Sequence, residues 1–132
     1  FIGMPVMNFF DAKLVENGGK YFVELGGVKV ELSPEKEARL KANNVKSQDI
    51  TLGVRPEHTD VVEGGVEGRV DVAEMMGSSV HLHIDYNGKD VIVIVPTQDL
   101  TESYNIGDKV HFTFNGNVAH VFSKETEKNL EY

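Results

Sequence analysis

The chain has 132 residues, of which 21 are acidic and 13 are basic, so its formal net charge is −8 at pH 7. A field of this sign repels nucleic-acid phosphates and anionic lipid surfaces, and it disfavours a polyanionic partner. Cysteine is absent, which excludes disulfides, thiolate metal sites and cysteine nucleophiles, and which suits a reducing cytoplasm.

The length fits one domain with a core of its own, or two small interlocked barrels. The hydrophobic fraction is 40%, and no apolar run reaches the roughly 18 residues that a membrane-spanning helix needs, so we expect a soluble protein. No basic segment followed by a long apolar stretch stands at the start, so no signal peptide is predicted. The first residue is Phe1 rather than methionine, and we expect further sequence upstream of it.

The first part of the sequence predicts a meander of three strands. Apolar and polar residues alternate over residues 8–15, 20–25 and 28–32, and glycine-containing turns at 17–19 and 26–27 separate these runs. The side chains expected on one face of the second strand are Tyr21, Val23 and Leu25.

Residues 34–43 are the one segment that predicts a helix. Ser33 is the expected N-cap, Pro34 occupies the first helical position, and acidic residues follow in the first turn. The apolar side chains of this segment are Ala38, Leu40 and Ala42. We expect a helix with so little apolar surface to bury little and to plug or cover the end of a barrel.

Further strands are predicted after the helix. Residues 49–54 form a strand that ends before Pro56. Residues 61–67 then cross the Gly64-Gly65 pair, after which the strand pattern restarts with residues 66–72. This restart is compatible with a second barrel unit.

The strongest local signal is a β-hairpin. Residues 79–86 and 89–95 flank Asn87-Gly88, and a type I′ turn needs positive φ at both central positions, which Asn and Gly tolerate. This turn sets the register of the two strands. The facing pairs are Tyr86 with Lys89, Ile84 with Val91, Leu82 with Val93 and Val80 with Val95. Because residues 91–95 are apolar on both faces, we expect their strand to be internal.

The last strands are predicted over residues 109–115 and 118–122, around Gly116. The side chains expected to point to one side are Val110, Phe112 and Phe114. Eight or nine short strands, one short helix and glycine-rich turns indicate a mainly β protein with an OB-like small barrel.

The expected domain organisation is a single domain over residues 1–132. Two interlocked barrel units, at about 8–65 and 66–122, remain an alternative because of the restart in the strand pattern. The charged segment 123–132 is predicted to be a frayed tail.

His81 and His83 alternate on one strand face, and such a pair can offer two imidazoles to one metal ion. Their partners in the predicted register are isoleucines, which supply no ligand, and Asp85 is the only nearby carboxylate that the register assigns. A structural role is therefore favoured, and no metal site is predicted. The remaining histidines, expected at the surface or half-buried, are His58, His111 and His120.

The sequence shows no catalytic and no cofactor-binding residues. It lacks a Gly-x-Ser-x-Gly elbow, a distinct pair of acids and the Gly-x-x-x-x-Gly-Lys-[Ser/Thr] loop that holds nucleotide phosphates. The glycine pairs between strands are explained by turn chemistry. We therefore predict that the chain is not an enzyme.

OB-like barrels can bind single-stranded nucleic acid through aromatic side chains in a positive groove. The aromatic cluster here consists of Phe9, Phe10, Tyr21 and Phe22. The charged residues near it in the sequence are Asp11, Glu16, Glu24, Lys13 and Lys20. Because both signs are mixed, core and surface roles are favoured and no nucleic-acid partner is predicted, although this alternative stays open.

Two sequence motifs carry a family resemblance. The opening Phe-Ile-Gly-Met-Pro-Val-Met-Asn-Phe, residues 1–9, resembles the segment that follows the ATPase domain in sugar-type ABC import ATPases of the maltose and multiple-sugar importer family. The run Leu-Gly-Val-Arg-Pro-Glu-His, residues 52–58, resembles a motif midway through the same regulatory domains. Residues 67–95, with Val70, Glu74 and Gly77, are similar to the family's later barrel.

The resemblance implies an OB-like, or TOBE-type, regulatory domain that joins an ATPase domain and works in a dimer beneath two membrane permease subunits. The implied partners are its own ATPase domain, a second ATPase subunit, the permease subunits and, in some members, a regulatory protein. ATP and magnesium are implied for the full-length subunit and no cofactor for this chain. The implied location is the cytoplasmic face of the cell membrane.

The residues that match the family motifs are the candidate structural or regulatory site: Gly3, Pro5, Met7, Asn8, Phe9, Gly53, Arg55, Pro56, Glu57 and His58. Pro56 blocks continuation of a strand ladder, so the chain must turn there. Arg55 and Glu57 are expected to tie neighbouring segments through charge-assisted hydrogen bonds.

An oxyanion-binding small barrel of the molybdate type is the alternative function. Such a site needs converging amides, hydroxyls or cations. Ser78, Ser79 and Thr97 could supply hydroxyls, but the negative net charge gives no general attraction for anions, and no Ser-Ala-Arg-Asn segment is present.

Overall fold

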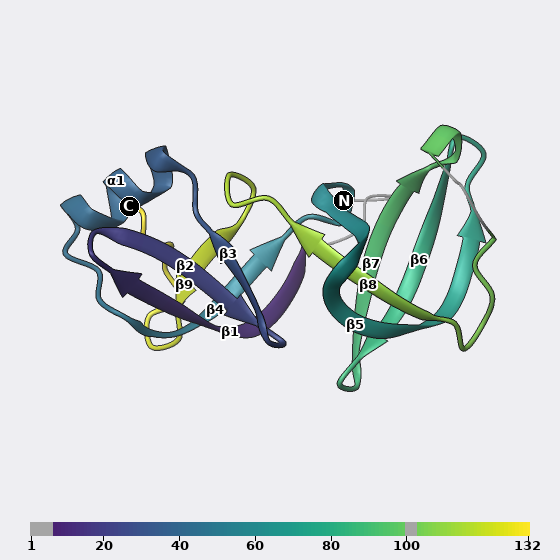
Figure 1. Cartoon of the computed structure of the whole chain (residues 1–132), viewed down its shortest axis with the longest axis horizontal. Coiled ribbons are helices and arrows are strands. Elements are labelled where there is room, and N and C mark those ends of the chain that lie inside the picture. The colour runs from purple at the N-terminus through teal and green to yellow at the C-terminus, as the bar shows by residue number, and fades with distance from the viewer. Residues whose placement is uncertain (1–6, 100–102) are drawn as a thin grey trace. The chain divides into compact units, whose positions relative to one another are not determined.

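The structure of the protein, a computed structural model, describes residues 7–99 and 103–132 (Figure 1). The described residues form nine β-strands, one α-helix and two short 3-10 helices. The strands belong to two sheets, one of five strands and one of four. The predicted mainly β class is therefore confirmed.

Contacts divide the chain into two compact units. The first, here called the helix unit, comprises Phe9–Val54 and Phe114–Tyr132. The second, the hairpin unit, comprises Arg55–Thr113 and the described part of Phe1–Asn8. These boundaries differ from sub-barrels at 8–65 and 66–122, because each unit is assembled from segments that are far apart in the sequence.

The hairpin unit contains a four-stranded sheet with the strand order β7-β6-β5-β8. Its strands are β5 (Thr59–Met75), β6 (Ser79–Tyr86), β7 (Lys89–Pro96) and β8 (Lys109–Phe114). The 3-10 helices η1 (Pro56–His58) and η2 (Thr97–Asp99) precede β5 and follow β7. The buried face of β8 carries the three predicted side chains, Val110, Phe112 and Phe114.

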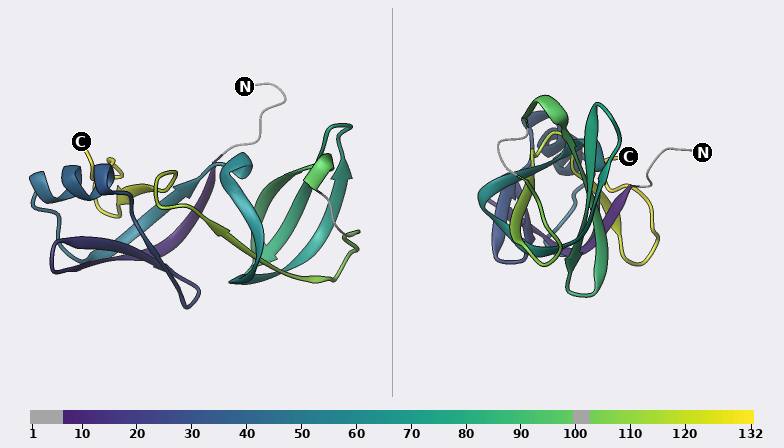
Figure 2. Two further views of the ribbon diagram at one scale, coloured as in Figure 1. Left: turned by 45° about the horizontal axis from the view of Figure 1, so that its top comes forward. Right: turned by 90° about the vertical axis from the view of Figure 1, so that its right-hand side faces the viewer.

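β5 is one strand of 17 residues, not the two strands predicted over 61–67 and 66–72. It continues through Gly64 and Gly65 and curves strongly (Figure 2). Gly64 has a φ of +77°, and a Cβ at Gly65 would overlap the backbone carbonyl of Phe112. The glycine pair therefore bends the strand and lets it pass close to β8, whereas the sequence suggested an interruption.

The predicted hairpin is confirmed in both turn and register. Asn87 and Gly88 have φ values of 51° and 83°. The Gly88 backbone N–H also donates a hydrogen bond to Asp85 Oδ1 at 2.9 Å. The observed pairs include Tyr86 with Lys89, Ile84 with Val91, Leu82 with Val93 and Val80 with Val95.

The prediction that residues 91–95 form an internal strand is wrong, because β7 stands at one end of its sheet. Ile92 and Ile94 are half-buried on the second face. η1 packs against β7, and the side chain of Asn8 bonds to the backbone of Ile92. The apolar character of both faces therefore reflects packing by other segments and not a second neighbouring strand.

The helix unit is built on a five-stranded sheet with the strand order β3-β2-β1-β4-β9. Its strands are β1 (Asn8–Asn17), β2 (Lys20–Leu25), β3 (Val28–Glu31), β4 (Gln48–Val54) and β9 (His120–Ser123). β1, β2 and β3 form the predicted meander. The buried face of β2 carries the three predicted side chains, Tyr21, Val23 and Leu25.

α1 (Pro34–Ala42) has the predicted N-terminal cap. The Ser33 hydroxyl accepts a hydrogen bond from the Lys36 backbone N–H at 3.4 Å. Leu40 is fully buried, while Ala38 and Ala42 are exposed. Figure 2 shows α1 at one end of the strands of its unit, as a covering helix should lie. Among the described residues, no helix has both the length and the apolar character to cross a bilayer.

Gly116 lies at a close crossing of two backbone segments. A Cβ at this position would overlap the backbone oxygen of Glu31 and would come within 2.8 Å of Leu32 Cα. The segments on either side of Gly116 belong to different sheets, because β8 joins the four-stranded sheet and β9 pairs with β4.

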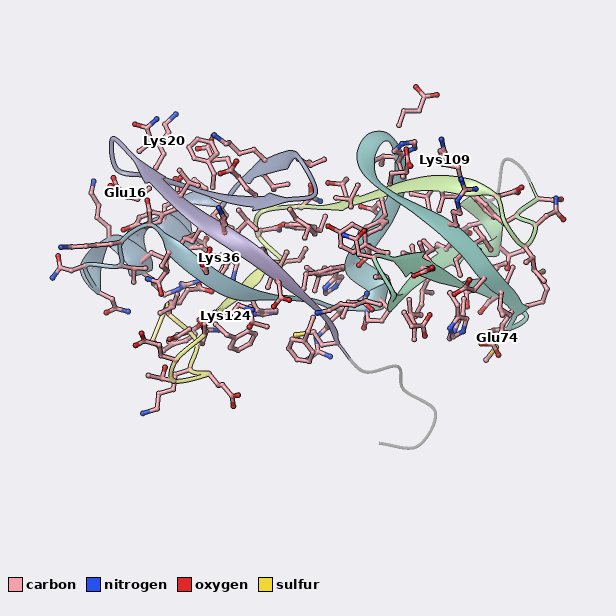
Figure 3. All side chains as sticks on the ribbon, turned by 90° about the horizontal axis from the view of Figure 1, so that it is seen from below. Glu16, Lys20, Lys36, Glu74, Lys109 and Lys124 are labelled. Carbon is pink, nitrogen blue, oxygen red and sulfur yellow. The ribbon has the colours of Figure 1, made fainter. Side chains whose placement is uncertain are left out.

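The predicted fraying of residues 123–132 is wrong, because this segment folds back on β9 and α1. The Leu130 N–H donates to the Val121 carbonyl at 2.9 Å. Glu131 is only 4% exposed, and Lys36, labelled in Figure 3, bonds to its carboxylate with an Nζ–Oε2 distance of 2.8 Å. Arg39 Nη2 lies 2.8 Å from Glu131 Oε1. A carboxylate bonded to two cations can be buried, and this anchors the segment.

The environment of Glu131 also shifts its protonation. Burial raises the pKa of this carboxyl, but the hydrogen bonds from Lys36 and Arg39 outweigh burial and hold the pKa below its usual value of 4.5. A lowered pKa stabilises the fold at pH values above 4.5, and this stabilisation is lost as the pH falls through the pKa of the folded state.

We predict that Glu131→Gln lowers the free energy of unfolding by about 1.5–3 kcal/mol at pH 7, because a charge-assisted hydrogen bond is lost and Lys36 stays buried. The difference from the wild type should shrink below pH 4.5. Urea unfolding from pH 7 to pH 3 measures both effects. Glu125→Gln, an exposed carboxylate of the same segment, is the control and should change little. Equal stability of Glu131→Gln and the wild type at pH 7 would contradict the anchoring role.

Candidate functional site

The motif at residues 52–58 turns the chain out of β4. Pro56 is buried and begins η1, and the Thr59 hydroxyl donates a hydrogen bond to the Arg55 carbonyl at 3.0 Å. The His58 N–H donates to the same carbonyl at 2.9 Å. Gly53 is buried at the end of β4. Buried and bonded residues therefore fix the turn from both sides.

The three charged or titratable side chains of this motif, Arg55, Glu57 and His58, are all exposed. Within the described residues, Arg55 and Glu57 make no side-chain hydrogen bond or ion pair. The expected tie between neighbouring segments is therefore not made by these side chains within the described residues. The tie is made by the Arg55 backbone and the Thr59 hydroxyl, which leaves the charged groups displayed on a rigid turn.

The opening motif is described from Met7 onward, and Gly3 and Pro5 lie outside the described residues. Met7 is half-buried. Phe9 is 51% exposed, and its ring packs edge-on against Phe122 with a centroid distance of 6.2 Å. An exposed aromatic residue in this position offers apolar surface beside β9.

Asn8 is the most engaged side chain of the opening motif, at 6% exposure. Its Nδ2 donates to the Ile92 carbonyl at 2.7 Å, and its Oδ1 accepts from the Ile92 N–H at 3.0 Å. The sequence marks Asn8 only as a motif residue. No local signal could predict a contact between residues so far apart along the chain.

The histidine pair on β6 lies as predicted, with His81 opposite Ile94 and His83 opposite Ile92. The prediction that Asp85 is the only nearby carboxylate is wrong. Glu74 Oε1 forms a short contact with His83 Nε2, and Asp90 Oδ2 lies 3.3 Å from His83 Nδ1. The predicted strand ends at residue 72, whereas β5 continues to Met75 and brings Glu74 into the ladder beside β6.

The two carboxylates set the protonation of His83. Partial burial lowers the pKa of its imidazole, but the hydrogen bonds to Glu74 and Asp90 dominate, so the pKa is raised above 6.5. Both ring nitrogens face a carboxylate, which suits an imidazolium ion and not a metal ligand. In residues 7–99 and 103–132 there is no group of three or more His, Asp or Glu side chains arranged to hold a metal.

The other histidines are dispersed. His58 is exposed on η1, and His120 is half-buried on β9. His111 Nε2 lies 3.7 Å from Glu67 Oε1 at the surface of the hairpin unit. They do not form a common site.

The hydroxyl residues considered for an oxyanion do gather where β6 begins and β7 ends. The Thr97 hydroxyl donates to the Gly77 carbonyl at 2.9 Å, and the Thr97 N–H donates to the Ser78 carbonyl at 2.9 Å. Ser79 faces Pro96 in the ladder. The Thr97 donors are therefore engaged within the turn itself.

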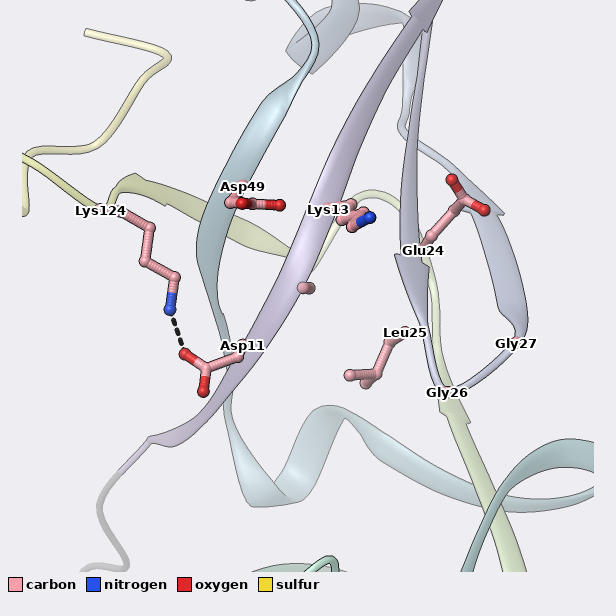
Figure 4. A pocket seen from close by; sticks show the side chains of 9 residues that line it. Asp11, Lys13, Glu24, Leu25, Gly26, Gly27, Asp49 and Lys124 are labelled. Atoms are coloured by element: carbon pink, nitrogen blue, oxygen red, sulfur yellow. Dashed lines mark hydrogen bonds and ion pairs between the residues drawn. The ribbon is translucent and has the colours of Figure 1, made fainter.

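An open hollow lies on the surface of the helix unit (Figure 4). Its lining carries three carboxylates and two lysines: Asp11, Glu24, Asp49, Lys13 and Lys124. Lys124 pairs with Asp11, and Lys13 stands opposite Glu24 in the ladder between β1 and β2. The hollow is therefore lined by exposed charged groups of both signs, and one pair of them, Lys124 and Asp11, is bonded to each other.

The aromatic residues of the first strands do not form a stacking surface. Phe10 and Tyr21 belong to the core, at 1% and 2% exposure. Phe22 lies beneath the Lys29 ammonium, which is 5.5 Å from its ring centre. The cluster is thus divided between core and surface, and it does not support a nucleic-acid site.

Comparison with known families matches the chain to two domain families. The MalK OB fold domain family matches residues 3–59, and the TOBE domain family matches residues 52–122. The chain belongs to the TOBE domain family. The OB-like fold class is therefore confirmed.

Similar proteins are ATP-binding proteins of ABC importers. The chain is 26% identical over 138 residues to the oligosaccharides import ATP-binding protein MsmX of Bacillus subtilis, covering 98% of the chain and 36% of MsmX. It is 28% identical over 135 residues to the multiple sugar-binding transport ATP-binding protein MsmK of Streptococcus mutans, covering 96% of the chain and 34% of MsmK. These matches confirm the family resemblance, and the chain spans about a third of the length of these relatives.

A solved structure shares the fold. The cytoplasmic molybdate-binding protein ModG, with molybdate bound, superposes with a TM-score of 0.65 at 12% identity, over 91% of this chain and 98% of ModG. At this identity the likeness concerns the fold alone.

We predict that NMR titration gives His83 a pKa above 6.5 and that Glu74→Gln lowers this pKa. The pKa of a base is raised, so the charged pairs stabilise the fold fully below pH 6.5, and this stabilisation is lost as the pH rises through the folded pKa. Glu67→Gln is the control, because Glu67 pairs with Lys109 and His111. A His83 pKa at or below 6.5 would show that its carboxylate contacts do not persist in solution.

Proposed function

We propose that this chain is the regulatory and dimer-tethering domain of an ABC importer ATPase for sugars or related solutes, with no catalysis of its own. The observation that supports the proposal is the extent of the similarity: 98% of the chain aligns with MsmX and 96% with MsmK. Two domain families, with matches that overlap at residues 52–59, also account for residues 3–59 and 52–122.

The proposed partners follow from the same similarity. An ATPase domain of the same subunit binds ATP and magnesium, a second ATPase subunit forms the dimer, and two permease subunits complete the transporter. A regulatory protein is a further proposed partner. The complex is proposed to lie at the cytoplasmic face of the cell membrane.

A domain without catalytic groups can alter ATP turnover in two ways. It can make contacts that differ between motor conformations, which shifts their populations. It can also hold two subunits together at high effective concentration. Arg55, Glu57 and His58 are the proposed contact groups, because they are exposed on a turn that buried Pro56 fixes. Gly3, Pro5, Met7, Asn8, Phe9 and Gly53 are proposed to position the surrounding segments.

An oxyanion-binding barrel is the second candidate, favoured by the gathering of Ser78, Ser79 and Thr97 at one turn. The engagement of the Thr97 donors with Gly77 and Ser78 argues against it. The negative net charge of −8 argues in the same direction.

Calorimetry on the isolated chain separates these candidates. We predict no saturable heat with ATP and magnesium, and none with molybdate or sulfate, because the chain has no phosphate loop and the Thr97 donors are engaged within their own turn. Micromolar binding of ATP to this chain would contradict the proposal that the nucleotide site lies in another part of the subunit. Micromolar binding of molybdate would favour the second candidate.

Removal of this domain from the full-length subunit tests the proposed function. We predict that a subunit without residues 8–132 still binds and cleaves ATP, while solute-stimulated hydrolysis or retention of the dimer is impaired. ATP hydrolysis with and without solute, and size-exclusion chromatography, measure these effects. Arg55→Ala with Glu57→Ala in the intact subunit tests the proposed contact groups, with exposed Lys46→Ala as the control. Unchanged coupling and assembly after the deletion would refute the tether.

A further inference from the structure

β7 is an edge strand, so backbone groups on its outer side cannot bond to another strand of the sheet. An edge strand presents backbone N–H and C=O groups that point away from its only neighbour. At Ile92 both groups bond to the Asn8 side chain, at 3.0 Å for the N–H and 2.7 Å for the carbonyl. A primary amide carries one acceptor and two donor hydrogens, so it can meet both groups of one residue. Asn8 therefore takes the place of one residue of a neighbouring strand.

The chemistry of this contact, here called the Asn8 clip, selects asparagine. A leucine of similar size has neither donor nor acceptor, and the hydroxyl of a serine is too short to span both backbone groups of Ile92. An ionised aspartate could accept from the N–H, but it would repel the carbonyl. Since Asn8 is 6% exposed, water does not readily replace these bonds.

The position of Asn8 in the chain gives the clip its significance. Asn8 is the first residue of β1, and Phe9 begins the helix unit. By its contacts, however, Asn8 belongs to the hairpin unit. Its hydrogen-bond partner there, Ile92, lies 84 residues further along the chain. The chain is therefore fastened to the β7 edge at the residue where it enters the five-stranded sheet.

We propose that Asn8 is a positioning residue that transmits movement of the chain upstream of it to the hairpin unit, through its paired hydrogen bonds to Ile92. This inference rests on the proposed function, in which an ATPase domain precedes the motif. Two bonds to one residue restrain both the distance and the rotation of the entering chain. A displacement of the backbone at Asn8 then reaches β7 through these two bonds. Without the clip, the backbone at Asn8 can move while β7 stays in place.

The test uses the full-length subunit in its assembled transporter. The variants Asn8→Leu and Asn8→Ser each remove the paired bonds. Two substitutions are used so that the test survives if one of them fails to fold. Asp108→Ala is the matched control, because it removes another side-chain bond to backbone in the hairpin unit, from the Asn105 N–H at 2.9 Å. All variants are compared at equal intervals below their unfolding temperatures.

We expect both Asn8 variants to lower the ratio of solute-stimulated to basal ATP hydrolysis by at least about fivefold, the lower end of typical energetic couplings between sites. Basal hydrolysis should stay close to the wild-type value. In the 132-residue chain, hydrogen exchange of the Ile92 amide should become faster in the Asn8 variants and stay unchanged in Asp108→Ala. A merely structural role would lower both activities together and would affect the control in the same way.

An unchanged ratio together with faster exchange at Ile92 would overturn the proposal, because the clip would be broken without loss of coupling. An equal fall of the ratio in Asp108→Ala would overturn it as well. The failure of this inference is separable from failure of the proposed function. If removal of residues 8–132 impairs coupling and the Asn8 variants do not, the tether stands and only the role of Asn8 is rejected.

Discussion

The structure depends on one constraint: the backbone N–H and C=O groups at the edge of a sheet need hydrogen-bond partners. An unpaired edge is exposed to water and to other chains, so small barrels must cover or close their edges. Here β7 is covered by the amide of Asn8, and β9 by the tail, through the bond from Leu130 to Val121. The buried Glu131 then holds that tail to α1. Segments from near both ends of the described chain thus bond to one edge of each sheet.

The family motifs divide into residues that shape the backbone and residues that remain accessible. Asn8, Gly53 and Pro56 are buried, and each serves packing, bonding or a turn. Arg55, Glu57 and His58 are exposed on the same rigid turn. A backbone that is already fixed loses little further conformational freedom when a partner binds, so the cost of ordering falls mainly on the side chains.

Local features were predictable because short-range physics determines them. The Asn87-Gly88 turn needs positive φ, and its position dictates every pair of the hairpin. The Ser33 cap likewise follows from local bonding. Features that join distant segments were not predictable: the continuity of β5 through its glycines, the placement of β7 at an edge, the docking of Glu131 and the contact of His83 with Glu74. Each depends on which segments meet, and hydrophobic periodicity does not encode that choice.

The division of the chain also bears on the order of folding during synthesis. Arg55–Thr113, which makes up most of the hairpin unit, is one continuous segment, and its remaining partner Asn8 has been made before it. The helix unit, in contrast, needs β9, which pairs with β4 across some 70 intervening residues. On the ribosome the later unit can therefore be completed first, while the earlier sheet waits for residues 120–123. During that interval β4 has an open edge, and a chaperone or a neighbouring nascent chain could occupy it.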